Sequence, residues 1–349
     1  MSAAERLLGL TLKNGWKVVE KLVRSDKSTG GCFSSGYRVE FQGKIGFLKA
    51  FDFSDAFLQG ADTFAELTRL TSMYTNERDL HLHCSESRLG NVVVAMDHGE
   101  VQIPDMGPME GRAFYLILEM ADGDIRVQMD QSKARDILWK VGVIQCVVKG
   151  LWQIHQQMIA HQDVKPSNIL LYGNNLCKIA DFGRASPKGR IGPLDDNAVA
   201  GDRTYAPPEL LYGYLAEDFN VRRFGCDLFL LGNMIAFLFS GTNITVALME
   251  NLHPQHRPDK WAGTYEDVLP YLENSFTKVI SVLQNQFDET VRERMVQLLR
   301  ELCSPNIRRR GFPKKLGHYE QFSLERYVSR LDLIVKETGV RLRSGLTAA

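Results

Sequence analysis

Two short segments hold side chains that together could transfer a phosphoryl group. The first runs from His161 to Asn168 and reads H-Q-D-V-K-P-S-N, and the second, D-F-G, begins thirteen residues later at Asp181. Asp163 could accept a proton from an attacking hydroxyl, and Lys165 could neutralise charge on the moving phosphoryl group. Asn168 and Asp181 offer the oxygen ligands that Mg²⁺ prefers. Phosphoryl transfer depends mainly on positioning and charge neutralisation, so these residue types suit it.

The order and spacing of these segments carry the signal, because a lone D-F-G is equally consistent with a tight turn after a strand. Together they resemble the eukaryotic-like (Hanks-type) protein kinases, whose H-R-D and D-F-G segments have this layout. The resemblance covers roughly residues 14–330. It implies transfer of the γ-phosphoryl group of Mg-ATP to a protein hydroxyl, with ATP and Mg²⁺ as cofactors. Lys165, two residues after Asp163, is typical of the Ser/Thr-specific members.

The resemblance assigns further residues on the nucleotide side. Lys49, at the end of an apolar β-rich run, matches the lysine that contacts the α- and β-phosphates. Its expected ionic partner is Glu77, chosen over Glu66 by its distance to the next strand. Residues 29–36 stand in the place of the glycine-rich phosphate loop, although alone they would be read as a hairpin turn. The loop residues expected to bind nucleotide are Gly30, Gly31, Phe33 and Ser34, with Ser34 replacing an outer glycine.

Around the adenine, the resemblance makes Leu118 the gatekeeper before the hinge. The carbonyl of Glu119 and the N–H of Ala121 are then expected to bond the adenine edge. Phe47 stands where the family usually has alanine, so its ring is expected to narrow the adenine pocket.

The segment Gly201-Asp202-Arg203-Thr204-Tyr205-Ala206-Pro207-Pro208-Glu209 resembles G-T-x-x-Y-x-A-P-E, which closes the activation loop. Asp202 replaces the usual threonine; its carboxylate is expected to pair with Lys165 and to raise the pKa of Asp163. Glu209 is expected to form a buried ion pair with an arginine of residues 308–310; Arg310 fits best and Arg308 is possible.

Three further positions follow from the resemblance. Asp227 is expected to hold the backbone of the catalytic loop, and His161 to pack on Phe182. Gln162 replaces the family's usual arginine and cannot pair with a loop phosphate. Ser186 is the only hydroxyl residue of residues 184–203. We therefore expect activity that does not depend on phosphorylation of this loop.

The patterns predict an α+β protein with a bilobal, protein-kinase-like fold. Strands are expected at residues 16–22, 37–41, 45–51, 91–97 and 114–119, and one or two helices at 62–82. A helical apolar face follows over residues 137–151. These elements give a β-rich N-lobe at about 14–118, a hinge at about 119–123, a helical C-lobe at about 124–330, and a C-terminal helix and tail at 331–349.

Composition limits the partners. The 349 residues hold 42 Lys and Arg against 42 Asp and Glu, which gives no case for nucleic acid. Six scattered cysteines without a C-x-x-C pair argue against zinc and disulfides and favour a reducing, cytoplasmic location. The longest apolar stretch, residues 228–239, is too short to span a bilayer, and the N-terminus does not read as a signal peptide. A protein substrate is expected, and the oligomeric state stays open.

Two other classes compete with an active protein kinase. A pseudokinase, binding ATP without turnover, would explain the irregular glycine loop, Phe47 and Asp202. The presence of Lys49, Asp163, Asn168 and Asp181 argues against it. A small-molecule phosphotransferase related to the aminoglycoside kinases would share H-x-D-x-x-x-x-N. The segment Pro207-Pro208-Glu209 and the pair Phe182-Gly183 argue against that class.

Overall fold

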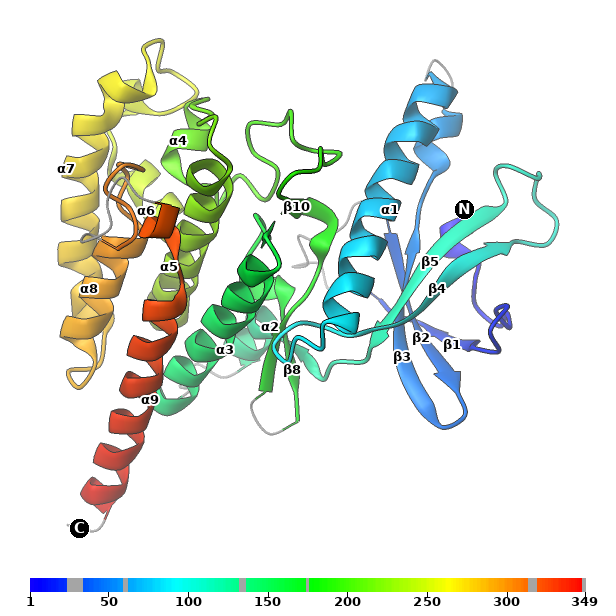
Figure 1. The fold of residues 1–349 in the computed structure, drawn as a ribbon, viewed down its shortest axis with the longest axis horizontal. Helices are drawn as coiled ribbons and strands as arrows, with labels where there is room; N and C mark the ends of the chain where they lie inside the picture. Colours follow the sequence, from blue (N-terminus) through cyan, green and yellow to red (C-terminus); the bar gives the residue numbers. More distant parts are fainter. Residues whose placement is uncertain (24–33, 59–61, 132–135, 174–175, 313–318, 347–349) are drawn as a thin grey trace.

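The computed structural model describes residues 1–23, 34–58, 62–131, 136–173, 176–312 and 319–346, and it has two lobes (Figure 1). The N-lobe is built on a five-stranded antiparallel sheet in the order β1-β2-β3-β5-β4. The α+β, kinase-like fold class predicted from the sequence is confirmed. The strands are β1 (Lys17–Lys21), β2 (Ser34–Phe41), β3 (Lys44–Phe51), β4 (Ala95–Gln102) and β5 (Arg112–Glu119).

The alternation of side chains along β3 determines the face of the sheet on which Lys49 lies. Leu48 and Ala50 are fully buried against one side of the sheet. Successive side chains of a strand point to opposite faces, so Phe47 and Lys49 lie on the other side. On that side α1 (Thr63–Glu86) packs, and Asp62 caps it by accepting a hydrogen bond from the Ala65 N–H at 3.0 Å. Lys49 of strand β3 therefore faces helix α1.

The strand expected at residues 91–97 is displaced in the structure. Strand β4 begins only at Ala95 and continues to Gln102. The preceding residues bond the backbone of the other lobe instead: the Val93 N–H donates to the Ile179 carbonyl at 3.0 Å, and the Ile179 N–H donates to the Asn91 carbonyl at 2.9 Å. Burial of Val92 and Val93 between the lobes explains why they read as strand residues.

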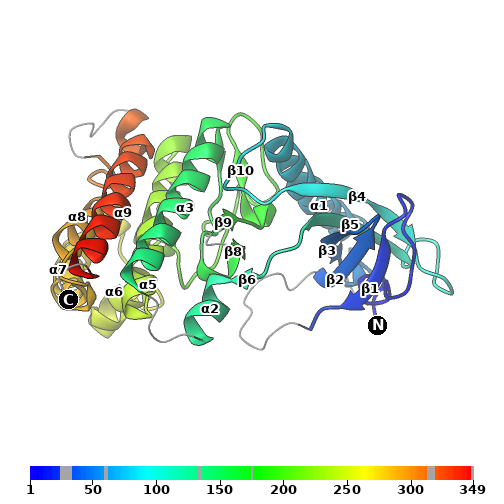
Figure 2. The ribbon, with the colours of Figure 1, turned by 90° about the horizontal axis from the view of Figure 1, so that it is seen from below.

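The C-lobe is helical, and α5 (Gly225–Ser240) lies at its centre with nearly all of its residues buried. Helix α3 (Ile137–Gln156) packs against α5 and α9, and α3 and α9 run side by side in Figure 2. Short strands between the lobes carry the catalytic segments.

The remaining elements are β6 (Gly123–Asp124), α2 (Ile125–Gln131), β7 (Ile159–Ala160), β8 (Ile169–Tyr172), β9 (Leu176–Ile179), β10 (Ser186–Pro187), α4 (Pro208–Leu211), the π-helical turn η5 (Asn220–Phe224), α6 (Ile244–Asn251), α7 (Tyr265–Leu283), α8 (Arg292–Leu302) and α9 (Glu325–Leu346).

Packing of the N-lobe reaches upstream of residue 14, the expected beginning of the domain. Ala3, Ala4 and Leu7 are buried in the same cluster as the sheet residues Tyr37 and Leu48. The Tyr37 hydroxyl also donates to the Ala4 carbonyl at 2.9 Å. The N-terminal residues are therefore part of the N-lobe core.

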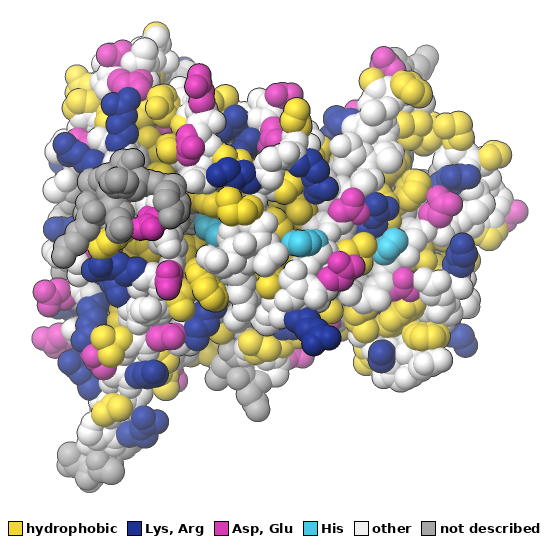
Figure 3. Space-filling view, viewed as in Figure 1, with side chains coloured by type: hydrophobic (Ala, Val, Ile, Leu, Met, Phe, Trp, Pro, Cys, Tyr) yellow, Lys and Arg dark blue, Asp and Glu magenta, His cyan; other side chains and the backbone are white. Residues whose placement is uncertain are grey.

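Two described helices, Ile137–Gln156 and Asn220–Ser240, are long and apolar enough to cross a membrane by length and composition alone. The second is longer than the apolar stretch read from the sequence because η5 continues into α5. Of their most apolar windows, 50% and 83% are buried inside the protein. Core helices meet the same criterion, so this is weak evidence for a membrane span. Basic and acidic side chains are interspersed over the face shown in Figure 3.

Candidate active site

The catalytic loop lies between β7 and β8 and is anchored by Asp227 of α5. The fully buried Asp227 accepts a hydrogen bond from the Gln162 N–H at 2.7 Å through Oδ1. Its Oδ2 accepts from the His161 N–H and pairs with His155 Nε2, both at 2.8 Å. Gln162 has φ 63°, in the left-handed region, a strain that surrounding contacts must sustain. The expected role of Asp227 is confirmed by these bonds.

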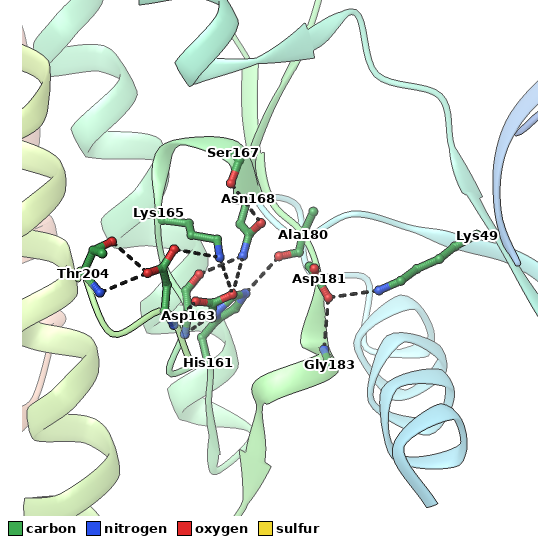
Figure 4. A network of polar contacts seen from close by, with 11 residues as sticks. Lys49, His161, Asp163, Lys165, Ser167, Asn168, Ala180, Asp181, Gly183 and Thr204 are labelled. Carbon is green, nitrogen blue, oxygen red and sulfur yellow. Dashed lines mark hydrogen bonds and ion pairs between the residues drawn. The ribbon is translucent and has the colours of Figure 1, made fainter. Parts of the chain in front are cut away.

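Asp163 is held from several sides (Figure 4). Lys165 Nζ lies 3.1 Å from its Oδ2, and Asn168 Nδ2 donates to Oδ2 at 3.1 Å and to its carbonyl at 2.8 Å. The Asp202 N–H donates to Oδ1 at 2.8 Å. Burial raises the pKa of Asp163, the Lys165 ammonium lowers it, and the Asp181 carboxylate raises it again. The net rise makes Asp163 a better proton acceptor than an ordinary aspartate.

Lys49 joins the two lobes electrostatically. Its Nζ lies 2.6 Å from Glu77 Oε1 and 3.1 Å from Asp181 Oδ1, so the ion pair predicted with Glu77 is present. The rejected Glu66 instead pairs with Arg69 of its own helix. Burial raises the pKa of Glu77 to about 7, although Lys49 lowers it. Burial opposes ionisation of Asp181 too, but Lys49 and the Gly183 N–H hold the pKa of Asp181 well below its usual range.

Two histidine rings pack on opposite sides of Phe182 in the D-F-G segment. His161 Nε2 lies 3.0 Å from the Ala180 carbonyl, and its ring centroid is 5.5 Å from that of Phe182. The packing expected between these two is therefore present. On the other side of Phe182 lies His81, with ring centroids 4.7 Å apart. Burial lowers the pKa of His81 to about 3, so its ring is neutral. Sequence reasoning missed His81, although it lies one helical turn after Glu77.

A cavity of about 160 Å³ is bordered by the charged groups described above, although Asn168 is not among the described residues that line it. Among the described residues that line it are five carboxylates and three cationic side chains, an excess of negative charge that suits a divalent cation. No group of three or more His, Cys, Asp or Glu in the described parts of the chain could hold a metal ion by itself. Mg²⁺ is commonly held by one or two carboxylates together with substrate phosphates and water, so Asp181 and Asn168 fit it. The carboxylates are Asp52, Glu77, Asp163, Asp181 and Asp202, and the cations are Lys49, Lys165 and Arg184.

The residues expected around the adenine are not brought to this cavity. Of the phosphate-loop residues, Ser34 lines the cavity, while Gly30, Gly31 and Phe33 lie outside the described residues. Glu119 and Ala121 are not among the described residues that line it. The Glu119 carbonyl accepts a hydrogen bond from the Tyr172 hydroxyl at 3.4 Å, and its carboxylate pairs with Lys178 at 2.6 Å.

Phe47 lies beside a glycine of the neighbouring strand. A Cβ added at Gly36 would come within 2.9 Å of the Phe47 ring, closer than side-chain atoms approach. The ring therefore occupies the space that a side chain at position 36 would fill. Gly36 on β2 and Phe47 on β3 are therefore a small and a large residue that fit together on the same face of the sheet.

Replacing Phe47 by Ala is expected to weaken ATP binding about five- to tenfold, because about 1 kcal/mol of apolar contact with the base is lost. The double variant Gly36→Val/Phe47→Ala, which refills the space from β2, is expected to recover most of the affinity. Calorimetric titration with ATP measures both. Equal dissociation constants for the parent and Phe47→Ala would show that the ring does not border the nucleotide.

The closing segment approaches the catalytic loop closely at Gly201. A Cβ there would lie 2.3 Å from the Gln162 carbonyl oxygen, so only glycine permits this approach. The next residue, Asp202, places its Oδ2 3.5 Å from Lys165 Nζ, which is the pairing expected from the sequence. Its Oδ1 accepts a hydrogen bond from the Thr204 hydroxyl at 2.7 Å.

The expected cause of the raised Asp163 pKa needs correction. Burial is the largest cause of the raised pKa of Asp163, and the charge of Asp181 raises this pKa further. Asp202 donates a backbone N–H hydrogen bond to Asp163, and this bond lowers the pKa. This backbone N–H remains after any substitution at position 202 except proline. The Asp202 carboxylate acts mainly on Lys165 and Thr204.

Asp202→Thr is therefore expected to keep most of the raised pKa of Asp163. Removing the Asp202 carboxylate leaves Asp163 as the carboxylate with which Lys165 pairs. The stronger pairing with the Lys165 ammonium lowers the pKa of Asp163. Activity requires the ionised base, so the acidic limb of the kcat/KM profile should move slightly to lower pH. Thr204→Val is the control for loss of the Thr204–Asp202 hydrogen bond. A limb that moves upward for Asp202→Thr would contradict this assignment.

Glu209 and Arg310 form the buried ion pair expected in the C-lobe. Arg310 Nη1 and Nη2 donate to the two Glu209 oxygens at 2.6 and 2.7 Å, and Arg310 is fully buried. Arg308, the other possibility, is exposed. Arg310 also donates to the Ser304 and Gly225 carbonyls, so it ties α4 to α5 and to the segment after α8.

Comparisons with known proteins agree with this geometry. The family model described as "Protein kinase domain" matches residues 70–320. The chain is 30% identical over 213 residues to serine/threonine-protein kinase PknJ of Mycobacterium tuberculosis, covering 58% of this chain and 35% of PknJ. It is 26% identical over 248 residues to serine/threonine-protein kinase PknB of Mycolicibacterium smegmatis, covering 68% and 37%. It is 30% identical over 148 residues to a Wee1-like protein kinase of Arabidopsis thaliana, covering 41% and 27%.

The chain belongs to the protein kinase domain family. The matched residues include most of α1, the catalytic loop, the D-F-G segment and the closing segment. The matches cover about a third of the length of the curated relatives named above.

Proposed function

We propose that the chain is an active Ser/Thr protein kinase that transfers the γ-phosphoryl group of Mg-ATP to a protein hydroxyl. One observation carries this proposal: Lys49, Glu77 and Asp181 meet Asp163 and Lys165 around a single cavity. This arrangement supports the proposal because phosphoryl transfer depends mainly on positioning and charge neutralisation. The names of the bacterial relatives and Lys165 support the Ser/Thr type.

Each group has a distinct task in the proposed reaction. Asp163 Oδ accepts the proton of the attacking hydroxyl as oxygen bonds to the γ-phosphorus and the bond to the β-phosphate oxygen breaks. Lys165, beside Asp163, neutralises charge on the transferring group, and Lys49 binds the α- and β-phosphates. Magnesium, held by Asn168 and Asp181, would neutralise charge on the phosphates. Glu77 fixes Lys49, because the ammonium lies between two carboxylates.

The pseudokinase remains the second candidate, and a specific observation favours it. The Glu119 carbonyl that would accept a hydrogen bond from the adenine amine already accepts one from the Tyr172 hydroxyl. Nucleotide would then have to share this carbonyl oxygen with the Tyr172 hydroxyl. This bond, at 3.4 Å, is long and weak, so we favour turnover.

The test is a transfer assay with the purified chain. Labelled ATP is supplied with Mg²⁺ or with EDTA, together with peptide mixtures fixed at Ser, Thr or Tyr and with aminoglycosides. Mg²⁺-dependent label on Ser and Thr peptides supports the proposal. ATP binding without transfer to any acceptor supports the pseudokinase, and label only on aminoglycosides supports the small-molecule enzyme.

We also propose a cytoplasmic location with a protein substrate as the principal partner. The support is chemical: none of the described cysteines, Cys84, Cys146, Cys177, Cys226 and Cys303, is in a disulfide. Reduced cysteines persist in a reducing compartment.

A further inference from the structure

Asp195 lies in the loop between β10 and α4, outside every motif considered above. Its Oδ1 accepts hydrogen bonds from the Ser186 hydroxyl at 2.7 Å and from Arg223 Nη2 at 2.9 Å. Its Oδ2 accepts from the Gly192 N–H at 2.7 Å. One carboxylate therefore connects the start and the middle of its own loop to the π-helical turn η5.

Arg223 is an unusual partner because it is only 4% exposed. It also donates to the Asp195 carbonyl at 3.1 Å and to the Gln162 side-chain oxygen. Burial lowers the pKa of Arg223, and the charge of Asp195 opposes that effect. A buried guanidinium needs such an anion, since removing one partner of a buried pair leaves an uncompensated charge.

Gln162 carries this network to the catalytic loop. Its side-chain amide donates to the Ser186 hydroxyl at 2.8 Å and to the Arg184 carbonyl at 2.9 Å. Gln162 directly precedes Asp163, and the far end of the loop returns to Asp163 through the Asp202 N–H. The loop is therefore bonded to Asp163 at one end and to the residue directly before Asp163 at the other.

The same loop also contacts α1. Asn76, the residue before Glu77, donates to the Ala185 carbonyl at 3.2 Å and accepts from Arg190 Nη2 at 3.4 Å. The position of the loop is thus linked to the helix that carries the partner of Lys49.

We propose that Asp195 is a positioning residue: a built-in anion that, with Arg223 as its cation, holds residues 184–202 in the arrangement that accepts substrate. The inference rests on the proposed function and deepens it by assigning its regulation. In other proteins an added phosphate orders such a loop by pairing with arginine. Here the permanent carboxylate of Asp195 pairs with arginine in place of such a phosphate, so the loop is ordered without phosphorylation.

Ser186 has a structural role in this arrangement. Its side chain is buried, donates to Asp195 and accepts from Gln162. A phosphate on Ser186 would face the Asp195 carboxylate and would repel it. Phosphorylation at this residue is therefore expected to disrupt the loop rather than to order it.

The test compares Asp195→Asn, Asp195→Glu and Arg223→Gln with the control Asp196→Asn, which removes a charge from the exposed neighbouring residue. We expect Asp195→Asn and Arg223→Gln to lower kcat at least tenfold with little change in KM for ATP. Asp195→Glu should recover part of the loss, and Asp196→Asn should match the parent. The double variant Asp195→Asn/Arg223→Gln should be no slower than either single variant, because both remove the same contact.

Two further measurements separate this inference from the proposed function. Hydrogen exchange of residues 184–203 is expected to speed up in Asp195→Asn and to stay unchanged in Asp196→Asn, whether or not the chain turns over ATP. Phosphatase treatment of the parent is expected to leave its rate within about twofold. Parent-like exchange and kcat in Asp195→Asn, or a tenfold loss on dephosphorylation, would overturn the inference. An inactive parent whose loop exchange still depends on Asp195 would overturn only the proposed activity.

Discussion

Replacing Lys49 by Met, Asp163 by Asn or Asp181 by Asn is expected to lower phosphotransfer about 100-fold or more, because each removes one component of the charge arrangement. Lys49→Met removes the cation between Glu77 and Asp181. Asp163→Asn removes the proton acceptor but keeps a side chain of the same shape. Asp181→Asn removes the carboxylate expected to bind Mg²⁺.

The three variants should be distinguishable by their kinetics. Asp163→Asn is expected to lower kcat with little effect on the dissociation constant of ATP, since its groups contact the acceptor hydroxyl. Asp181→Asn should raise the Mg²⁺ concentration needed for half-maximal rate. Lys49→Met should weaken ATP binding as well as lower kcat. Lys44→Met, which changes an exposed lysine of the same strand, is the matched control and should behave like the parent.

Folding is checked independently of activity. Circular dichroism and thermal melting of each variant show whether a loss of rate is a loss of structure. Near-parent rates in all three variants, with unchanged melting, would mean that this site does not perform the measured phosphotransfer. The proposed roles of Lys49, Asp163 and Asp181 would then be wrong.

Local sequence signals were sufficient for the chemistry of the C-lobe side of the site. Asp163, Lys165 and Asn168 lie within six residues of one another, and the short turn after β7 brings them together. Asp227 could be assigned because the family pattern names its position. The pairing of Lys49 with Glu77 was predictable because the family resemblance implies a helix glutamate as partner, and the distance to the next strand favoured Glu77 over Glu66.

The adenine side and the activation loop could not be predicted in the same way. Whether Phe47 blocks or borders the pocket depends on Gly36, a residue on a different strand. The contact between Asp195 and Arg223 joins residues that belong to no common motif, and the π-helical turn that presents Arg223 leaves no signal in the pattern. The start of β4 was misplaced because Val92 and Val93 are apolar for a different reason, their burial between the lobes.

Arg310→Met is expected to destabilise the chain by about 3–5 kcal/mol, because it leaves the buried Glu209 carboxylate without a counter-charge. Arg310 makes two short bonds to Glu209 and is 0% exposed, so water cannot replace the lost partner without local unfolding. Arg310→Lys keeps the charge but loses the two-fold contact, so its loss should be smaller. The change in the free energy of unfolding is measured by urea denaturation monitored by circular dichroism, from the midpoint of the C-lobe transition.

The control for this experiment is Arg308→Met, which removes an exposed guanidinium two residues away. Surface charges contribute about 0–1 kcal/mol, so Arg308→Met should unfold at nearly the parent midpoint. The double variant Glu209→Gln/Arg310→Met removes both charges and should recover part of the loss, since no unpaired carboxylate remains. A double variant as unstable as Arg310→Met would show that the carbonyl bonds of Arg310 to Ser304 and Gly225, rather than the ion pair, hold this part of the C-lobe together.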